Sequence, residues 1–114
     1  MRVLIAALAG AALLSAAPAH GAARKTVTVG DNYFTSQSLT VKHGTKITWR
    51  WPGYDQAGDV HDVGLMKGPK GVKKFRSEPA STDYSYSRKL DTPGTYRLGC
   101  SLHEGMRMTV RVRS

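Results

Sequence analysis

The residues best suited to chemistry lie close together near the end of the 114-residue chain. Cys100, the only cysteine in the sequence, is followed by His103 and then by Met106. A thiolate and an imidazole with a thioether are groups that soft copper favours. A trigonal site of two imidazoles and one thiolate, with a weak axial thioether, is typical of electron-transfer copper centres. The segment supplies three of these four groups, so a second histidine must come from elsewhere.

The chain offers three candidates for that second histidine. His20 lies at the end of an apolar N-terminal segment, and His43 lies in a Lys-His-Gly turn, where a solvated side chain is the simpler interpretation. His61 stands between a long polar loop and a short apolar segment. Because the loops of a β-sandwich gather at its ends, His61 can lie beside the loop that follows Cys100. The sequence therefore favours His61.

The first 23 residues have the three parts of a secretory signal peptide. Arg2 gives a basic start, residues 3–17 are apolar, and residues 17–23 are small enough for cleavage. The apolar run is short for a membrane span, which needs roughly 20 residues. We therefore expect cleavage between residues 19 and 23. The mature protein is then a single domain over residues 24–114, periplasmic or extracellular, with no membrane span.

The single cysteine and the positive net charge restrict the possible functions further. A lone cysteine cannot make an internal disulfide, so in an oxidising compartment it must join two chains, be buried, or bind a metal. The residues around Cys100 favour the metal. The formal charge is +9, or +8 once Arg2 is removed, which favours acidic partners. No basic helical face or aromatic-interleaved basic run points to nucleic acid.

Polar and apolar residues alternate along most of the mature chain, as in half-buried strands. Short turns after the first strands predict antiparallel neighbours, and Tyr33 and Phe34 are expected to face the core. Near the end of the chain, alternation places Tyr96, Leu98 and Cys100 on one face. Seven or eight short strands without a helical period indicate an all-β sandwich or small barrel. The predicted strands are 25–29, 38–41, 46–51, 61–65, 84–87, 95–100 and 107–113.

These segments, in their order and spacing, resemble the cupredoxins. This family of small blue copper proteins includes plastocyanin, amicyanin and pseudoazurin. The resemblance covers nearly all of the mature chain and implies an all-β Greek-key β-sandwich of about seven or eight strands, with one type 1 copper ion at one end. It implies three ligands, His61, Cys100 and His103. The matching segments are 39–44, 47–49, 61–63 and 93–103, closed by Val110 and Val112.

The axial methionine requires a choice between Met106 and Met108. In the family the ligand lies three residues after the histidine, as in amicyanin, or five, as in plastocyanin and pseudoazurin, and the two residues fit these spacings. In both cases the ligand precedes the first apolar residue of the closing strand by four positions. Counting back from Val110 gives Met106. Met108 remains the alternative ligand, and is otherwise a core or rim methionine.

The sequence departs from the family pattern at three positions. Asp62 stands where an asparagine commonly links the two ligand loops, so that link is in question. Leu102 replaces a frequent proline. Gly99 removes the aromatic residue that gives some relatives a lateral route for electrons.

The resemblance implies a one-electron carrier and not an enzyme. His103 is the expected route of electron exchange, and an acidic redox partner is expected to dock near it on a monomeric protein. A partner could be steered by a group of basic residues, although a solvated loop is the simpler interpretation: Lys67, Lys70, Lys73, Lys74 and Arg76.

Two functions are alternatives to the electron carrier. One is a copper carrier or buffer for copper delivery or tolerance, and the other is a metal-free sandwich that binds other proteins. Four histidines are too few for the trinuclear cluster of a multicopper oxidase together with this site.

Overall fold

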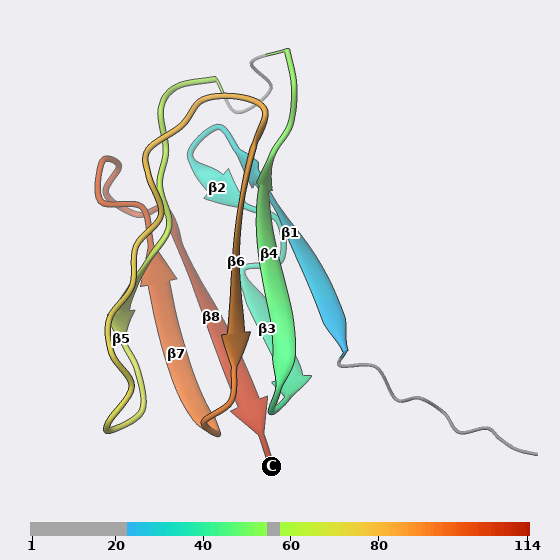
Figure 1. Ribbon diagram of the computed structural model, residues 1–114. Helices are drawn as coiled ribbons and strands as arrows, with labels where there is room; N and C mark the ends of the chain where they lie inside the picture. Colours follow the sequence, from blue (N-terminus) through green and yellow to red (C-terminus); the bar gives the residue numbers. More distant parts are fainter. Residues whose placement is uncertain (1–22, 55–57) are drawn as a thin grey trace, which may run out of the picture.

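The computed structural model describes residues 23–54 and 58–114, where the chain forms eight β-strands and no helix (Figure 1). Apart from Ala23, the predicted signal peptide lies outside the described residues, and so does His20. No helix that is long and apolar enough to cross a membrane occurs in the described part of the chain. The strands are β1 (Arg24–Gly30), β2 (Tyr33–Phe34), β3 (Ser38–Lys42), β4 (Thr45–Trp51), β5 (Gly64–Lys67), β6 (Tyr84–Leu90), β7 (Gly94–Gly99) and β8 (Arg107–Arg113).

The strands form two four-stranded sheets that face each other (Figure 1). The strand order is β2-β1-β4-β6 in one sheet and β3-β8-β7-β5 in the other. The core lies between the sheets and includes Trp49, Trp51 and Tyr96, each at most 1% exposed. The predicted all-β sandwich of seven or eight strands is confirmed.

Alternation along the strands explains which side chains enter the core. Successive side chains of a strand point to opposite faces. In β8, Met108, Val110 and Val112 are buried, whereas Arg107 and Arg111 are exposed. The same rule places Tyr96, Leu98 and the adjoining Cys100 inward, as predicted. It also corrects the prediction for Tyr33, which is 51% exposed because its neighbour Phe34 takes the inward position.

The predicted antiparallel pairing of the first strands holds for β1 and β2 and is wrong for β3 and β4. β1 and β2 are antiparallel, but β1 runs parallel to β4, and β3 belongs to the opposite sheet, where it runs parallel to β8. Polar–apolar alternation determines which face of a strand is buried. It does not determine the neighbour, so the crossing of β3 between sheets leaves no trace in the local pattern.

The predicted strand over residues 61–65 begins later, at Gly64. Before it, His61 forms an isolated bridge with Ala80, with reciprocal backbone hydrogen bonds of 2.9 Å. A second isolated bridge joins Gly64 to Arg76. The segment that follows β5 therefore folds back along residues 61–64 and holds them in place.

Three connections gather at one end of the sandwich (Figure 1). They are the chain between β4 and β5, the segment that leads into β6, and the loop between β7 and β8. The first contains His61 and the third contains Cys100 and His103. The fold thus brings together residues from separate parts of the sequence.

Candidate metal centre

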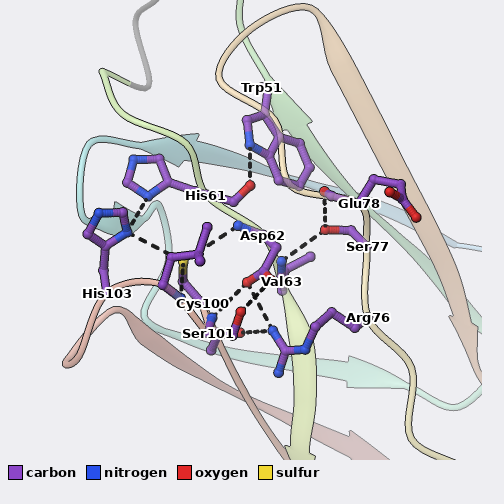
Figure 2. A network of polar contacts seen from close by, with 12 residues as sticks. Trp51, His61, Asp62, Val63, Arg76, Ser77, Glu78, Cys100, Ser101 and His103 are labelled. Atoms are coloured by element: carbon purple, nitrogen blue, oxygen red, sulfur yellow. Dashed lines mark hydrogen bonds and ion pairs between the residues drawn. The ribbon is translucent and has the colours of Figure 1, made fainter.

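His61, Cys100 and His103 meet at this end of the sandwich (Figure 2). Their candidate ligand atoms all lie within 4.8 Å of one another. The two Nδ1 atoms of His61 and His103 are 3.1 Å apart, and Cys100 Sγ is 3.6 Å from His103 Nδ1. Three of the four residues predicted as ligands are thus adjacent, with two ring nitrogens and one sulfur directed into the same space.

The three residues differ in their access to solvent. His61 is 0% exposed and Cys100 is 7% exposed, whereas the side chain of His103 is 24% exposed. Leu102, next to His103, is an exposed apolar residue. One edge of the cluster therefore reaches the surface while the rest is enclosed by the sandwich.

The loop that bears Cys100 and His103 is closed by its own backbone. Cys100 N donates to Met106 O at 3.0 Å, and Met106 N donates to His103 O at 3.3 Å. Gly105 has a φ of 88°, a left-handed conformation that glycine adopts without a steric penalty. These contacts fix Cys100, His103 and Met106 relative to one another within a few residues of chain.

Each histidine ring has a carboxylate on its outer nitrogen. His61 Nε2 lies 3.4 Å from Asp31 Oδ1, and His103 Nε2 lies 3.3 Å from Asp59 Oδ2. A carboxylate at the remote nitrogen fixes the tautomer and orientation of a metal-binding imidazole. Hydrogen bonds from the Val60 backbone and from His103 hold the pKa of Asp59 below its usual value. Neither aspartate was predicted from the sequence, because only the fold brings these turn and loop residues beside the histidines.

Backbone amides point at the cysteine sulfur. Asp62 N is 3.5 Å and Leu102 N is 3.4 Å from Cys100 Sγ. N–H groups directed at a sulfur stabilise its anionic form and tune a bound metal. The two donors come from the two different ligand segments, so the sulfur is held from both sides.

The Asp62 carboxylate links those two segments. It accepts hydrogen bonds from Ser101 N at 2.7 Å, Ser101 Oγ at 2.6 Å and Arg76 Nη1 at 2.9 Å (Figure 2). Burial alone would raise the pKa of Asp62, but the hydrogen bonds from Ser101 and the charge of Arg76 outweigh burial and lower the pKa. The aspartate that replaces the family's asparagine therefore does connect the loops.

The remaining predicted residues occupy different environments. Met106 is 1% exposed and Met108 is 2% exposed, and the Met108 sulfur accepts a hydrogen bond from the Trp49 indole. His43 lies in an exposed turn, where its backbone N–H donates to Arg113 O, and it is not part of the cluster. The interpretation of residues 67–76 as a solvated loop is wrong for Arg76, because its side chain forms an ion pair with the buried Asp62.

The donor set fits copper. Two imidazole nitrogens and a thiol sulfur are the groups that soft copper prefers, whereas calcium and magnesium require oxygen ligands. Here the carboxylates of Asp31 and Asp59 contact the outer ring nitrogens of His61 and His103.

A sequence model of copper-binding proteins of the plastocyanin/azurin family matches residues 21–113. A 55-residue segment is 40% identical to a protein of Rhizobium leguminosarum bv. viciae named as a pseudoazurin. The matched segment is 46% of this chain and 34% of that relative, so the chain spans about a third of the length of the curated relative it matches.

Solved structures with the same fold agree with this match. Amicyanin from Paracoccus versutus (Thiobacillus versutus) superimposes with a TM-score of 0.64 at 26% identity, over 85% of both chains. A copper-containing nitrite reductase from Thermus scotoductus SA-01 superimposes with a TM-score of 0.70 at 22% identity, over 90% of this chain and 25% of the reductase. The reductase match is a likeness of fold alone.

Proposed function

Because the chain belongs to the plastocyanin/azurin family of copper-binding proteins, we propose that it is an exported blue copper protein that passes single electrons between redox partners. The fold is that of a cupredoxin, and copper is the cofactor. The observation that supports the specific role most directly is the convergence of His61, Cys100 and His103 at one end of a closed sandwich.

The proposed ligands are Nδ1 of His61, Sγ of Cys100 and Nδ1 of His103, with Met106 as the axial ligand. The first three donors already face one another. Met106 is supported by its position in the closed loop, where its backbone is bonded to both Cys100 and His103. Met108 is a weaker candidate, because its thioether already accepts the Trp49 N–H.

Copper in such a site supplies a one-electron redox couple. The protein's part is to keep the ligands still while the charge changes. His61 is fixed by its bridge to Ala80 and by Asp31 at its outer nitrogen. Cys100 is fixed by the hydrogen bond to Met106 and by two amides at its sulfur. Little movement on electron transfer means a small reorganisation cost.

Electron exchange is proposed to occur through His103, the partly exposed member of the cluster. Leu102 supplies an exposed apolar contact beside it. Four exposed lysines favour an acidic partner through long-range attraction: Lys67 at the end of β5, and Lys70, Lys73 and Lys74 in the segment that follows. The N-terminal sequence supports export of a protein that then acts in the periplasm or outside the cell.

Copper delivery or buffering is the second candidate, because it would use the same residues. Delivery requires the metal to leave readily. His61 and Cys100 are both buried, and backbone hydrogen bonds hold them in a closed arrangement. That enclosure favours retention of the metal and hence the electron carrier.

The decisive experiment combines a visible spectrum with metal retention. The copper-loaded protein is expected to show an intense blue absorption that Cys100→Ser abolishes, and to cycle reversibly in voltammetry without losing copper. Rapid transfer of Cu(I) to a competing chelator during cycling would instead support copper delivery. Absence of a blue band in the Cu(II)-loaded protein would overturn the electron carrier, and failure to bind copper in either oxidation state would overturn both candidates.

A further inference from the structure

Arg76 pairs with the buried carboxylate of Asp62, whose backbone amide contacts the sulfur of the proposed ligand Cys100. One nitrogen of its guanidinium, Nη1, donates to Asp62 Oδ1 at 2.9 Å and to the Gly99 carbonyl at 3.2 Å (Figure 2). Asp62 follows His61 in the chain, and Gly99 precedes Cys100. Arg76 therefore joins the two segments that hold the two buried candidate ligands.

Hydrogen bonds on both sides of Arg76 fix the position of its backbone. Leu65 N donates to Phe75 O at 2.9 Å, and Ser77 N donates to Val63 O at 2.8 Å. Ser77 Oγ accepts from Val63 N at 3.0 Å. These bonds on both sides of Arg76 align residues 75–77 with residues 63–65. The side chain is thereby directed over β5 toward Cys100.

Gly64 provides the space for this side chain. A Cβ atom at position 64 would lie 2.2 Å from Arg76 Cζ. The guanidinium therefore lies directly against the backbone of β5, where no larger residue fits without displacing it. The side chain of Arg76 is 37% exposed and that of Asp62 is 6% exposed, so the ion pair joins a partly exposed cation to a buried carboxylate.

Charge explains why such a contact is needed. A neutral amide at position 62 could link the two loops without a counter-ion, whereas a buried carboxylate is costly unless it is paired. The Asp62 amide donates to Cys100 Sγ, so its carboxylate is only a few bonds from a sulfur that must be anionic to bind a metal. An unpaired negative charge at this position would disfavour the thiolate.

We propose that Arg76 is a positioning residue of the copper site. It neutralises Asp62 and fixes the His61–Asp62 segment against Gly99 and Cys100. It thereby sets both the geometry of the sulfur and the charge that the metal experiences. This inference rests on the proposed function and names a residue outside the ligand set.

The test is a cycle of charge-matched variants measured in the copper-loaded protein. Arg76→Gln leaves the negative charge of Asp62 uncompensated, which favours the more positive, oxidised metal. We expect the ratio of reduced to oxidised protein at a fixed applied potential to fall about ten-fold. Asp62→Asn leaves the positive charge of Arg76 and is expected to raise the ratio. The double variant should return to within about two-fold of the unmodified protein.

The control is Arg111→Gln, which removes an exposed arginine of β8 and changes the net charge equally. It should shift the ratio by less than about two-fold, because exposed charges at a distance are screened. If Arg76→Gln matches this control, or if both single variants shift the ratio in the same direction, the proposal is wrong. Arg76→Lys retains the charge and should leave the ratio within about two-fold; a larger fall would also overturn it.

Thermal unfolding of the copper-free protein tests the ion pair independently of the metal. Arg76→Gln should lower the unfolding midpoint by about 5–10 °C, because it strands a buried carboxylate. Adding Asp62→Asn should recover at least half of that loss, and no recovery would contradict the pairing. If the unmodified protein fails to bind copper, the proposed function fails, and this unfolding cycle still decides whether Arg76 compensates Asp62.

Discussion

The indole Nε1 of Trp49 donates a hydrogen bond to the sulfur of Met108 across the sandwich, at a distance of 3.3 Å. Both side chains are buried, at 0% and 2% exposure. A buried indole N–H requires an acceptor, and here the acceptor is the thioether of the alternative axial candidate. The contact gives the Met108 thioether a partner in the core, which supports the proposal of Met106 as the axial ligand.

Substitution of Met106 should therefore change the visible spectrum, whereas substitution of Met108 should change the stability of the fold. Met106→Gln is expected to shift the visible spectrum and the reduction potential, because the axial ligand tunes both. Met108→Leu should leave the spectrum unchanged but lower the free energy of unfolding by about 1–2 kcal/mol, because the Trp49 N–H loses its acceptor. Absorption spectra and denaturant unfolding measure the two effects. If Met108→Leu shifts the spectrum and Met106→Gln does not, then Met108 is the axial ligand and Met106 is not.

Asp31 is expected to affect copper affinity more than its exposed position suggests. It contacts Nε2 of the fully buried His61, and loss of such a partner typically weakens metal binding. Asp31→Ala should lower copper affinity by about ten-fold in competition with a chelator. Asp91→Ala is the matched control, since Asp91 is an exposed aspartate paired with Lys89. Equal affinities in the two variants would show that Asp31 does not orient His61.

Acid should destabilise the copper-free protein in part through Asp62. Its pKa is lowered in the folded state, so the unfolded chain binds more protons as the pH falls below roughly 4. The stability that Asp62 contributes is fully present above that pH and is lost as the pH falls through the folded-state pKa. Urea unfolding at several pH values should therefore show a shallower loss of stability below pH 4 in Asp62→Asn. Parallel curves for the two proteins would refute this contribution.

Gly64 offers an indirect way to displace Arg76. Alanine at this position would force the guanidinium away from β5, since the added Cβ would lie 2.2 Å from its central carbon. Gly64→Ala should lower the reduction potential, in the same direction as removal of the arginine charge from Asp62. Adding Asp62→Asn should reverse the shift. Voltammetry of the single and double variants provides the comparison, and an unchanged potential in Gly64→Ala would mean that Arg76 retains its contact.

Association with an acidic redox partner should depend on salt. Charges that steer a partner over distance are screened when the Debye length falls from about 10 Å at 0.1 M to about 3 Å at 1 M ionic strength. Stopped-flow rates with an acidic acceptor should fall steeply with added salt, and should fall less steeply in a Lys73→Gln/Lys74→Gln variant. The same double substitution should leave the visible spectrum unchanged. A flat salt response in the unmodified protein would argue against electrostatic docking.

The sequence predicted the parts of this structure that depend on local pattern. Alternation identified the buried faces of β4, β7 and β8, and the short spacing from Cys100 to Met106 identified one half of the site. His61 was predicted as well, because a loop that precedes a strand can reach the end of a sandwich. The structure places His61 and His103 with their Nδ1 atoms 3.1 Å apart.

The parts that the sequence did not predict depend on the approach of distant segments. Nothing in the local pattern shows that Asp31 and Asp59 meet the histidines, or that β3 crosses to the opposite sheet. Arg76 was grouped with four lysines as part of a charged loop, because a run of cations gives no sign of which one faces a buried carboxylate. Such pairings become visible only when the backbone path is known.

The position of β8 has a consequence for the order of folding. It is an inner strand, between β3 and β7, and its parallel partner β3 lies far earlier in the sequence. The sheet beside the copper site therefore cannot close until residues 107–113 have emerged and crossed the molecule to pair with β3. Contacts over such sequence distances slow folding. We therefore expect the loop that carries Cys100 and His103 to become ordered only after β8 has paired with β3, and copper to bind after that pairing.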